Sequence, residues 1–293
     1  MSTDAVGRRA EVSAFLELGK LRLSSLAVFA VLAGLYLGAD VAPPWPVVVG
    51  CCFGTMLVAM GANALNMYIE REPDRRMPRT QNRPLPEGRL TPGQVLGFGI
   101  FTGIAGTAWL WLVSNTLATM LCAAILLTYV AAYTPLKRVT TLNTLVGAIP
   151  GALPPLVGYA AGAGTLDLKA LVLFAILFLW QIPHFLAIAW RYRVDYSLGG
   201  MRMLPSEDPE GRMTSRQMVL YTLALILATQ FAYEVELAGP LYLIVSLFLG
   251  ILFLVPVVIA AFFRVESAMR LCFLASILYL PALLGVMVLD KIP

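Results

Sequence analysis

Nine apolar segments, each about as long as a bilayer is thick, constrain this chain more than any other feature of its sequence. A spanning helix needs about 20 apolar residues. The chain is 59% hydrophobic and only 13% charged, whereas soluble domains carry about 25% charged residues. The sequence therefore predicts an all-α polytopic membrane protein with little room for a soluble domain. The predicted spans are 21–39, 46–69, 94–114, 116–133, 143–162, 168–189, 215–235, 239–263 and 267–289.

The distribution of basic residues predicts how these spans are oriented. With the N-terminus inside, every Lys and Arg except Lys169 and Lys291 falls in an inside segment, as the positive-inside rule requires. One span more or fewer would scramble this partition, so we expect a cytoplasmic N-terminus and a periplasmic C-terminus. The net charge of +4 follows from these loop arginines and does not indicate nucleic-acid binding. The four cysteines lie in apolar segments without metal-ligand spacing, which is typical of small core residues.

The stretch from 61 to 90 begins in an apolar segment and continues into a segment with many charged residues. Asn66, Glu70 and Asp74 are four residues apart, so a continuous helix would place them on one face. Oxygen ligands in this register suit Mg²⁺, which usually keeps waters and takes further ligands from a phosphate. Arg79 and Arg83 follow, and arginines bind phosphate through paired hydrogen bonds. We expect a diphosphate site at a membrane edge, although a solvated cytoplasmic loop is the plainer alternative.

Pro73 complicates the helical register of this stretch. Inside a helix its ring would clash with the carbonyl of Ile69. We therefore expect the helix to end or kink near Ile69, with Asp74 reaching the site from irregular backbone.

Two further inside segments carry candidate ligands. Lys137 and Arg138 end the fourth span, where they would either hold phosphate or act as positive-inside anchors. The segment 143–162 is rich in Gly, Ala and Pro, which predicts a kinked helix lining an interior. Arg202 follows Gly199-Gly200 in the long loop after the sixth span and is a third candidate for the phosphate.

The sixth span and its loop contain the only histidine of the chain, His184, and the carboxylate Asp195. A lone membrane histidine is either a hydrogen-bonded packing residue or a functional group. Asp195 could complete a Mg²⁺–diphosphate site opposite the first three ligands, or pair with a neighbouring arginine. The loops 70–93 and 190–214 are separated by four spans, so they share an orientation. This arrangement hints at an internal duplication, with the two loops facing each other over one cavity.

Three blocks of the sequence resemble the membrane-embedded UbiA prenyltransferase superfamily and, within it, the protohaem IX farnesyltransferases. They are NMYIEREPDRRMPRTQNRPLPEGRL, YTPLKRVTTLNTLVGAIPGALPPLVGYAA and WQIPHFLAIAWRYRVDYSLGGMRMLP. Glu70 stands where the first motif of the superfamily usually has Asp, and Gly199 stands where the second motif has a second Asp. The resemblance covers about residue 15 to the end.

This resemblance implies nine helices around a central cavity, in one domain from 21 to 293 that follows a cytoplasmic segment, 1–20, with the two long loops capping the site. It implies transfer of the farnesyl group of farnesyl diphosphate to a vinyl group of haem b, with water addition, giving haem O. Asn66, Glu70, Asp74 and Asp195 would hold Mg²⁺, and His184, Trp180 and Tyr192 would face the porphyrin. The protein would lie in the bacterial cytoplasmic membrane and pass haem O to haem A synthase or a terminal oxidase.

Two alternatives remain open from the sequence. One is another UbiA-type aromatic prenyltransferase. The other is a secondary transporter, which also has many spans and broken helices. The acidic sites of a transporter tend to lie near the bilayer midplane, however, whereas most carboxylates here lie at cytoplasmic helix ends.

Overall fold

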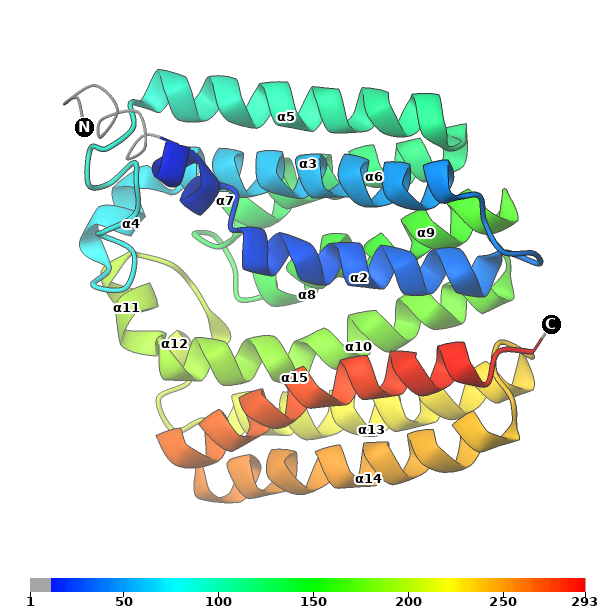
Figure 1. Cartoon of the computed structure of the whole chain (residues 1–293). Helices are drawn as coiled ribbons and strands as arrows, with labels where there is room; N and C mark the ends of the chain where they lie inside the picture. The colour runs from blue at the N-terminus through cyan, green and yellow to red at the C-terminus, as the bar shows by residue number, and fades with distance from the viewer. Residues whose placement is uncertain (1–11, 293) are drawn as a thin grey trace, which may run out of the picture.

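The computed structural model describes residues 12–292, and all regular structure in that range is helical. The long helices lie side by side along one direction (Figure 1). The N-terminal part of the predicted cytoplasmic segment, 1–11, lies outside the described residues. The first described residues and the C-terminus lie at opposite ends of the bundle.

Within the described residues 12–292, seven helices are long and apolar enough to cross a membrane. The other two predicted spans are also helical, but the apolar part of α2, Ser24–Gly38, is shorter, and α13 is not among the seven. Helix α13 contains polar residues, which lower its mean hydropathy. Some of them, such as Thr222 and Thr229, are buried. The polytopic all-α fold is confirmed, and the count of nine spans stays a prediction. The seven are Trp45–Ile69 (α3), Pro92–Val113 (α5), Thr116–Leu136, Asn143–Ala163, Leu168–Arg191 (α10), Pro240–Phe263 (α14) and Glu266–Leu289 (α15); the other two helices are Leu21–Gly38 (α2) and Arg212–Glu234 (α13).

Two of the spans are composite. The span Thr116–Leu136 changes from α-helix to a π-helical turn before it ends, and the span Asn143–Ala163 is divided at Leu153. Pro154 and Pro155 follow this division, and neither can donate a backbone hydrogen bond to the preceding turn. The predicted kink in the fifth span is thus confirmed. The component helices are Thr116–Leu127 (α6), Thr128–Tyr133 (η1), Thr134–Leu136 (α7), Asn143–Ala152 (α8) and Pro154–Ala163 (α9).

Helices α2 and α9 approach each other through glycines. A Cβ at Gly34 would lie 1.9 Å from the carbonyl oxygen of Pro155, and one at Gly158 would lie 1.9 Å from that of Val31. Small residues allow membrane helices to pack backbone against backbone. This contact fixes α2, and with it the loop that precedes α2 at the end of the bundle.

Both long loops begin with a short helix at one end of the bundle (Figure 1). Helix α4 (Arg71–Arg76) follows α3, and α11 (Arg193–Leu198) follows α10; the two short helices contact each other. The short helix α12 (Leu204–Glu207) lies at the same end. The predicted meeting of the two long loops is therefore confirmed.

The break near Ile69 is confirmed, but the expectation that Asp74 lies on irregular backbone is wrong. Helix α3 ends at Ile69, and α4 places Pro73 in its first turn, where the missing N–H is not needed. The Ile69 carbonyl that Pro73 leaves without a donor accepts a hydrogen bond from Arg138 Nη2 at 3.2 Å. Asp74 is consequently held on helical backbone, and its N–H donates to the Glu70 carbonyl at 2.8 Å.

Candidate functional site

A polar cavity of about 120 Å³ lies at the end of the bundle where the two loops meet. Residues from α3, α4, η1, α11 and the adjoining loops surround it, so both halves of the chain contribute. It is lined by Lys20, Asn66, Glu70, Asp74, Met77, Arg79, Arg83, Tyr129, Lys137, Tyr196 and Met201.

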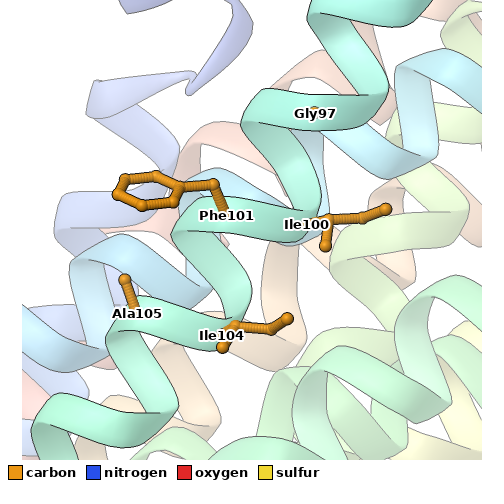
Figure 2. Close-up of a pocket in the computed structure, with 5 residues that line it drawn as sticks. All are labelled: Gly97, Ile100, Phe101, Ile104 and Ala105. Atoms are coloured by element: carbon orange, nitrogen blue, oxygen red, sulfur yellow. The ribbon is translucent and has the colours of Figure 1, made fainter.

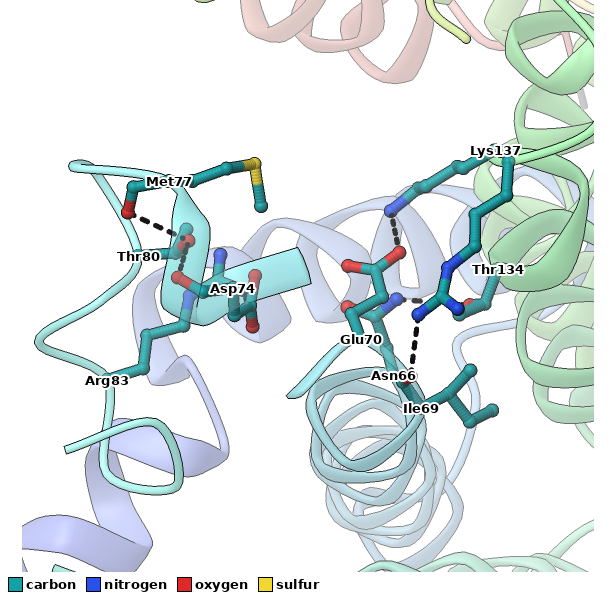
Figure 3. Close-up of polar contacts among 10 residues, drawn as sticks. Asn66, Ile69, Glu70, Asp74, Met77, Thr80, Arg83, Thr134 and Lys137 are labelled. Carbon is teal, nitrogen blue, oxygen red and sulfur yellow. Dashed lines mark hydrogen bonds and ion pairs between the residues drawn. The ribbon is translucent and has the colours of Figure 1, made fainter. Parts of the chain in front are cut away.

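Asn66 and Glu70 reach this cavity from the last turn of α3 (Figure 3). Asn66 Nδ2 donates to Thr134 Oγ1 at 3.0 Å, which leaves the amide oxygen as an acceptor. Glu70 Oε1 accepts from Lys137 Nζ at 2.8 Å, and both side chains are almost fully buried. The i, i+4 spacing brings both side chains to the same cavity, because α3 is regular up to Ile69, and their role as metal ligands stays a prediction.

Asp74 is fully buried and lies beside Arg83 in the part of Figure 3 that shows α4. Its Oδ2 accepts from Arg83 Nη1 at 2.7 Å, and Thr80 Oγ1 donates to its backbone carbonyl at 2.9 Å. Its Oδ1 is buried without a hydrogen-bond partner. Burial raises the pKa of the Asp74 carboxyl, although Arg83 opposes the shift. A buried carboxylate oxygen without a donor suits a cation.

Lys137 joins the fourth span to this site. Burial opposes its charge, but the Glu70 carboxylate and the nearby tyrosines outweigh that cost and raise the pKa of Lys137 well above its usual range. Its ammonium lies 4.5 Å from the ring centroid of Tyr133, within cation–π distance. Lys137 is therefore a fixed positive charge next to a carboxylate.

Arg79 is held by aromatic faces instead of a carboxylate. Its guanidinium carbon lies 4.6 Å from the ring centroid of Tyr192 and 5.3 Å from that of Tyr196. Stacking leaves the planar N–H fork free to meet an anion in the plane of the group. Arg79 thus lines the cavity with its guanidinium against the ring of Tyr192, and its binding to the diphosphate stays a prediction.

Lys20 also lines the cavity, and the sequence analysis did not identify it. It caps α2 with a left-handed backbone, φ 47°, which is uncommon outside glycine. Ser24 Oγ donates to the Gly19 carbonyl at 2.9 Å, and Asn63 Nδ2 also donates to this carbonyl, so the turn is fixed. Burial lowers the pKa of Lys20 to about 7, and Arg83 and Lys137 add repulsion. In the sequence, Lys20 had been counted only as a positive-inside residue at the start of the first span.

Asp195, the fourth predicted metal ligand, does not line the cavity, and its role as a ligand stays a prediction. The next residue of α11, Tyr196, does so, and adjacent helical residues point roughly 100° apart. Counted from the start of each short helix, Tyr196 matches Asp74, and Asp195 matches Pro73. Gly199 has a packing role, since a Cβ there would lie 2.9 Å from Met77 Sδ.

Arg138 and Arg202, which were predicted to bind the diphosphate, do not line the cavity either. Arg138 binds the end of α3, as described above. Arg202 is exposed, and its guanidinium contacts the Glu207 carboxylate and the Val139 carbonyl.

His184 and Trp180 lie together on α10, where they face α15. His184 Nδ1 is 2.7 Å from Ser276 Oγ, and Trp180 Nε1 donates to the Ser276 carbonyl at 2.9 Å. The two rings stack with centroids 5.0 Å apart. Neither residue lines the polar cavity, and Tyr192 lies apart from them against Arg79. The predicted haem-facing trio is thus divided between two places.

The charges of the cavity favour an anion. Four lining cations, Lys20, Arg79, Arg83 and Lys137, face the two carboxylates Glu70 and Asp74. Within residues 12–292 no group of three or more His, Cys, Asp or Glu side chains could hold a metal by itself. Asn66, Glu70 and the unpartnered Asp74 Oδ1 fit a Mg²⁺ ion that takes its other ligands from water and phosphate.

A second hollow, of about 400 Å³, is unsuited to this chemistry (Figure 2). All of its lining residues belong to α5 and are apolar: Gly97, Ile100, Phe101, Ile104 and Ala105. Phe101 is 72% exposed, as expected of a face turned to lipid.

Comparison with known proteins shows the family and the fold of this chain. The family model described as the UbiA prenyltransferase family matches residues 27–287. The chain belongs to the UbiA prenyltransferase family. Among curated members, a protoheme IX farnesyltransferase of Solibacter usitatus (strain Ellin6076) is 43% identical and covers 94% of this chain and 98% of its own. The Myxococcus xanthus (strain DK1622) protein of the same name is 41% identical, with 96% and 95% covered.

Solved structures of UbiA-type proteins share the fold of this chain at low sequence identity. A digeranylgeranylglyceryl phosphate synthase has a TM-score of 0.80 at 16% identity, covering 96% of this chain and 98% of its own. A UbiA homolog from Archaeoglobus fulgidus bound to GPP and Mg²⁺ has a TM-score of 0.66 at 13% identity, covering 94% and 99%.

Proposed function

We propose that this chain transfers the farnesyl group of farnesyl diphosphate to a vinyl group of haem b, with water addition, giving haem O and diphosphate. The observation that carries the proposal is the polar cavity of a UbiA family member whose curated relatives are protoheme IX farnesyltransferases over nearly their whole length.

The cavity residues would hold the diphosphate and stabilise its departure. Lys20, Arg79, Arg83 and Lys137 supply positive charge where the C–O bond to the farnesyl group breaks. Asn66, Glu70 and Asp74 would hold Mg²⁺, partly through water, as the metal of an Archaeoglobus fulgidus homolog suggests. When bound, this ion would neutralise charge on the leaving diphosphate.

The allylic cation then forms a carbon–carbon bond with the vinyl group of haem b. The positive charge moves to the porphyrin-side carbon, water adds there, and one proton is released. Burial of the site excludes water until this step. We assign His184 and Trp180 to the porphyrin side of the protein, because they lie on α10 away from the diphosphate cavity.

The direct test incubates purified protein with Mg²⁺, labelled farnesyl diphosphate and haem b, and measures the mass of the haem product. We expect a farnesyl group plus one water on haem b, and none when the metal is chelated. If haem b stays unmodified and a parallel reaction with an aromatic quinone precursor takes up the label, another prenyltransferase activity of the family is favoured. Uptake of label into vesicles without any product would favour a transporter.

His184 is tested separately by haem titration. We expect His184→Ala to weaken haem b binding and to leave farnesyl diphosphate binding nearly unchanged. The reverse pattern would remove His184 from the porphyrin side.

A further inference from the structure

The segment that carries Lys137 is bound to the second long loop by a set of hydrogen bonds. The backbone N–H of Arg202 donates to the Lys137 carbonyl at 2.6 Å, and Arg202 Nη1 donates to the Val139 carbonyl at 3.0 Å. Asn143, at the start of α8, is fully buried beside them. Its Nδ2 donates to the carbonyls of Thr140 at 2.6 Å and Arg202 at 2.8 Å.

The orientation of the Asn143 amide follows from these partners. An amide nitrogen has two protons, and both carbonyls are acceptors only. If the amide were reversed, its oxygen would face two carbonyl oxygens. Asn143 can therefore hold Thr140 and Arg202 together in a way that a carboxylate of the same shape cannot.

The contacts of Arg202 also explain why it is absent from the cavity. Its Nε and Nη2 bind the Glu207 carboxylate at 2.5 and 3.1 Å, while Nη1 is used by Val139. The guanidinium fork is thus occupied by the Glu207 carboxylate and the Val139 carbonyl, and it is not turned towards the polar cavity.

We propose that Asn143 and Arg202 are positioning residues that fix Lys137 against Glu70, so that the second long loop acts on the diphosphate site through Lys137. This inference rests on the proposed function in taking the cavity as a diphosphate site. A lysine side chain has four rotatable bonds, and its ammonium can be placed reproducibly only if its backbone is fixed. The hydrogen bonds around 137–143 supply that constraint.

The test is a double-mutant cycle on farnesyl diphosphate binding, measured without haem so that it does not depend on the acceptor. We expect Asn143→Asp to weaken binding roughly tenfold. In a Lys137→Ala background the same substitution should weaken it by less than about twofold, because the group it positions is gone. An equal effect in both backgrounds, or none in the wild-type background, would overturn the proposal.

Two further variants keep the test decisive if Asn143→Asp folds poorly. Arg202 is exposed, so Arg202→Ala should be tolerated by the fold. We expect it to weaken farnesyl diphosphate binding less than Asn143→Asp does, and this effect should also disappear in the Lys137→Ala background. Asn115→Asp is the matched control, because Asn115 Nδ2 donates to the Ala160 carbonyl at 2.6 Å and does not line the cavity. It should lower thermal stability without changing diphosphate affinity. If wild-type protein binds farnesyl diphosphate but does not modify haem b, the proposed function fails while this cycle still decides the role of Asn143.

Discussion

Lys20 presents an amine to a cavity that already contains three other cations. With a pKa of about 7, the amine of the free protein loses its proton as the pH rises through neutrality. An anionic diphosphate favours the charged form, so binding takes up a proton above about pH 7. We expect farnesyl diphosphate affinity to fall between about pH 6 and about pH 9.

The control for this pH dependence is Lys20→Arg, because a guanidinium stays protonated throughout the range. Substrate ionisation is common to both proteins, so the ratio of their dissociation constants isolates Lys20. Parallel pH profiles would show that Lys20 does not titrate against the diphosphate.

Arg83 has two partners in this account, the Asp74 carboxylate and the diphosphate. Arg83→Lys keeps the charge but removes the planar fork. We expect the KM for farnesyl diphosphate to rise by about fivefold to tenfold, with normal membrane insertion and haem binding. Arg212→Lys is the control, since Arg212 is highly exposed and pairs with Glu210. Equal KM values for the two variants would make Arg83 a topology anchor only.

At the residue scale, the sequence predicted side chains on regular backbone better than side chains on loops. Asn66 and Glu70 follow from helical spacing, because α3 continues to Ile69. The position of Lys20 depends on its left-handed backbone and on the hydrogen bonds that Ser24 and Asn63 donate to the preceding carbonyl. Neither feature can be recognised from the residues next to Lys20 in the sequence. Asp195 does not line the cavity, whereas the next residue, Tyr196, does. The sequence of the loop could not show this, because it does not reveal which face of α11 is turned towards the cavity.

Among the elements, the contact between α2 and α9 requires glycine at positions where any side chain would clash with the backbone of the other helix. A Cβ at Gly158 would lie 1.9 Å from the Val31 carbonyl oxygen, which is backbone and cannot rotate away. We expect Gly158→Ala to lower the thermal midpoint markedly, since overpacking costs about 1–3 kcal/mol or more. Thermal unfolding of the detergent-purified protein measures this.

Gly285→Ala is the matched control for this packing prediction. A Cβ at Gly285 in α15 meets no atom within 4 Å, and alanine favours a helix over glycine. Its thermal midpoint should stay unchanged or rise. If both variants behaved alike, the close approach of α2 and α9 would be wrong.

The element boundaries were largely predictable because hydropathy and charge set them. The predicted span 168–189 corresponds to Leu168–Arg191, and 143–162 corresponds to the divided helix Asn143–Ala163. The fourth span is predicted to end at 133, where the π-helical turn ends, but α7 continues it to Leu136. Pro135 lies near the start of α7, where its missing N–H is tolerated.

For the whole molecule, the placement of both long loops at one end gives a topological prediction. Gln81 is exposed in the first long loop, Pro209 is exposed in the second, and Val41 lies at the other end with 79% exposure. In spheroplasts, a membrane-impermeant thiol reagent should label Val41→Cys and leave Gln81→Cys and Pro209→Cys unlabelled. The parent protein with its native cysteines is the background control. External labelling of either loop position would contradict the cytoplasmic placement of the site.

Turnover by an Asp74→Asn variant tests the central claim, that the cavity between the two loops performs metal-assisted diphosphate departure. The substitution keeps the shape of the side chain and an acceptor for Arg83, but it removes the charge next to the unpartnered Oδ1. Single-turnover farnesyl transfer to haem b at saturating Mg²⁺ should slow by about 100-fold or more, with unchanged thermal stability and haem affinity. Transfer within about twofold of wild type would contradict the account.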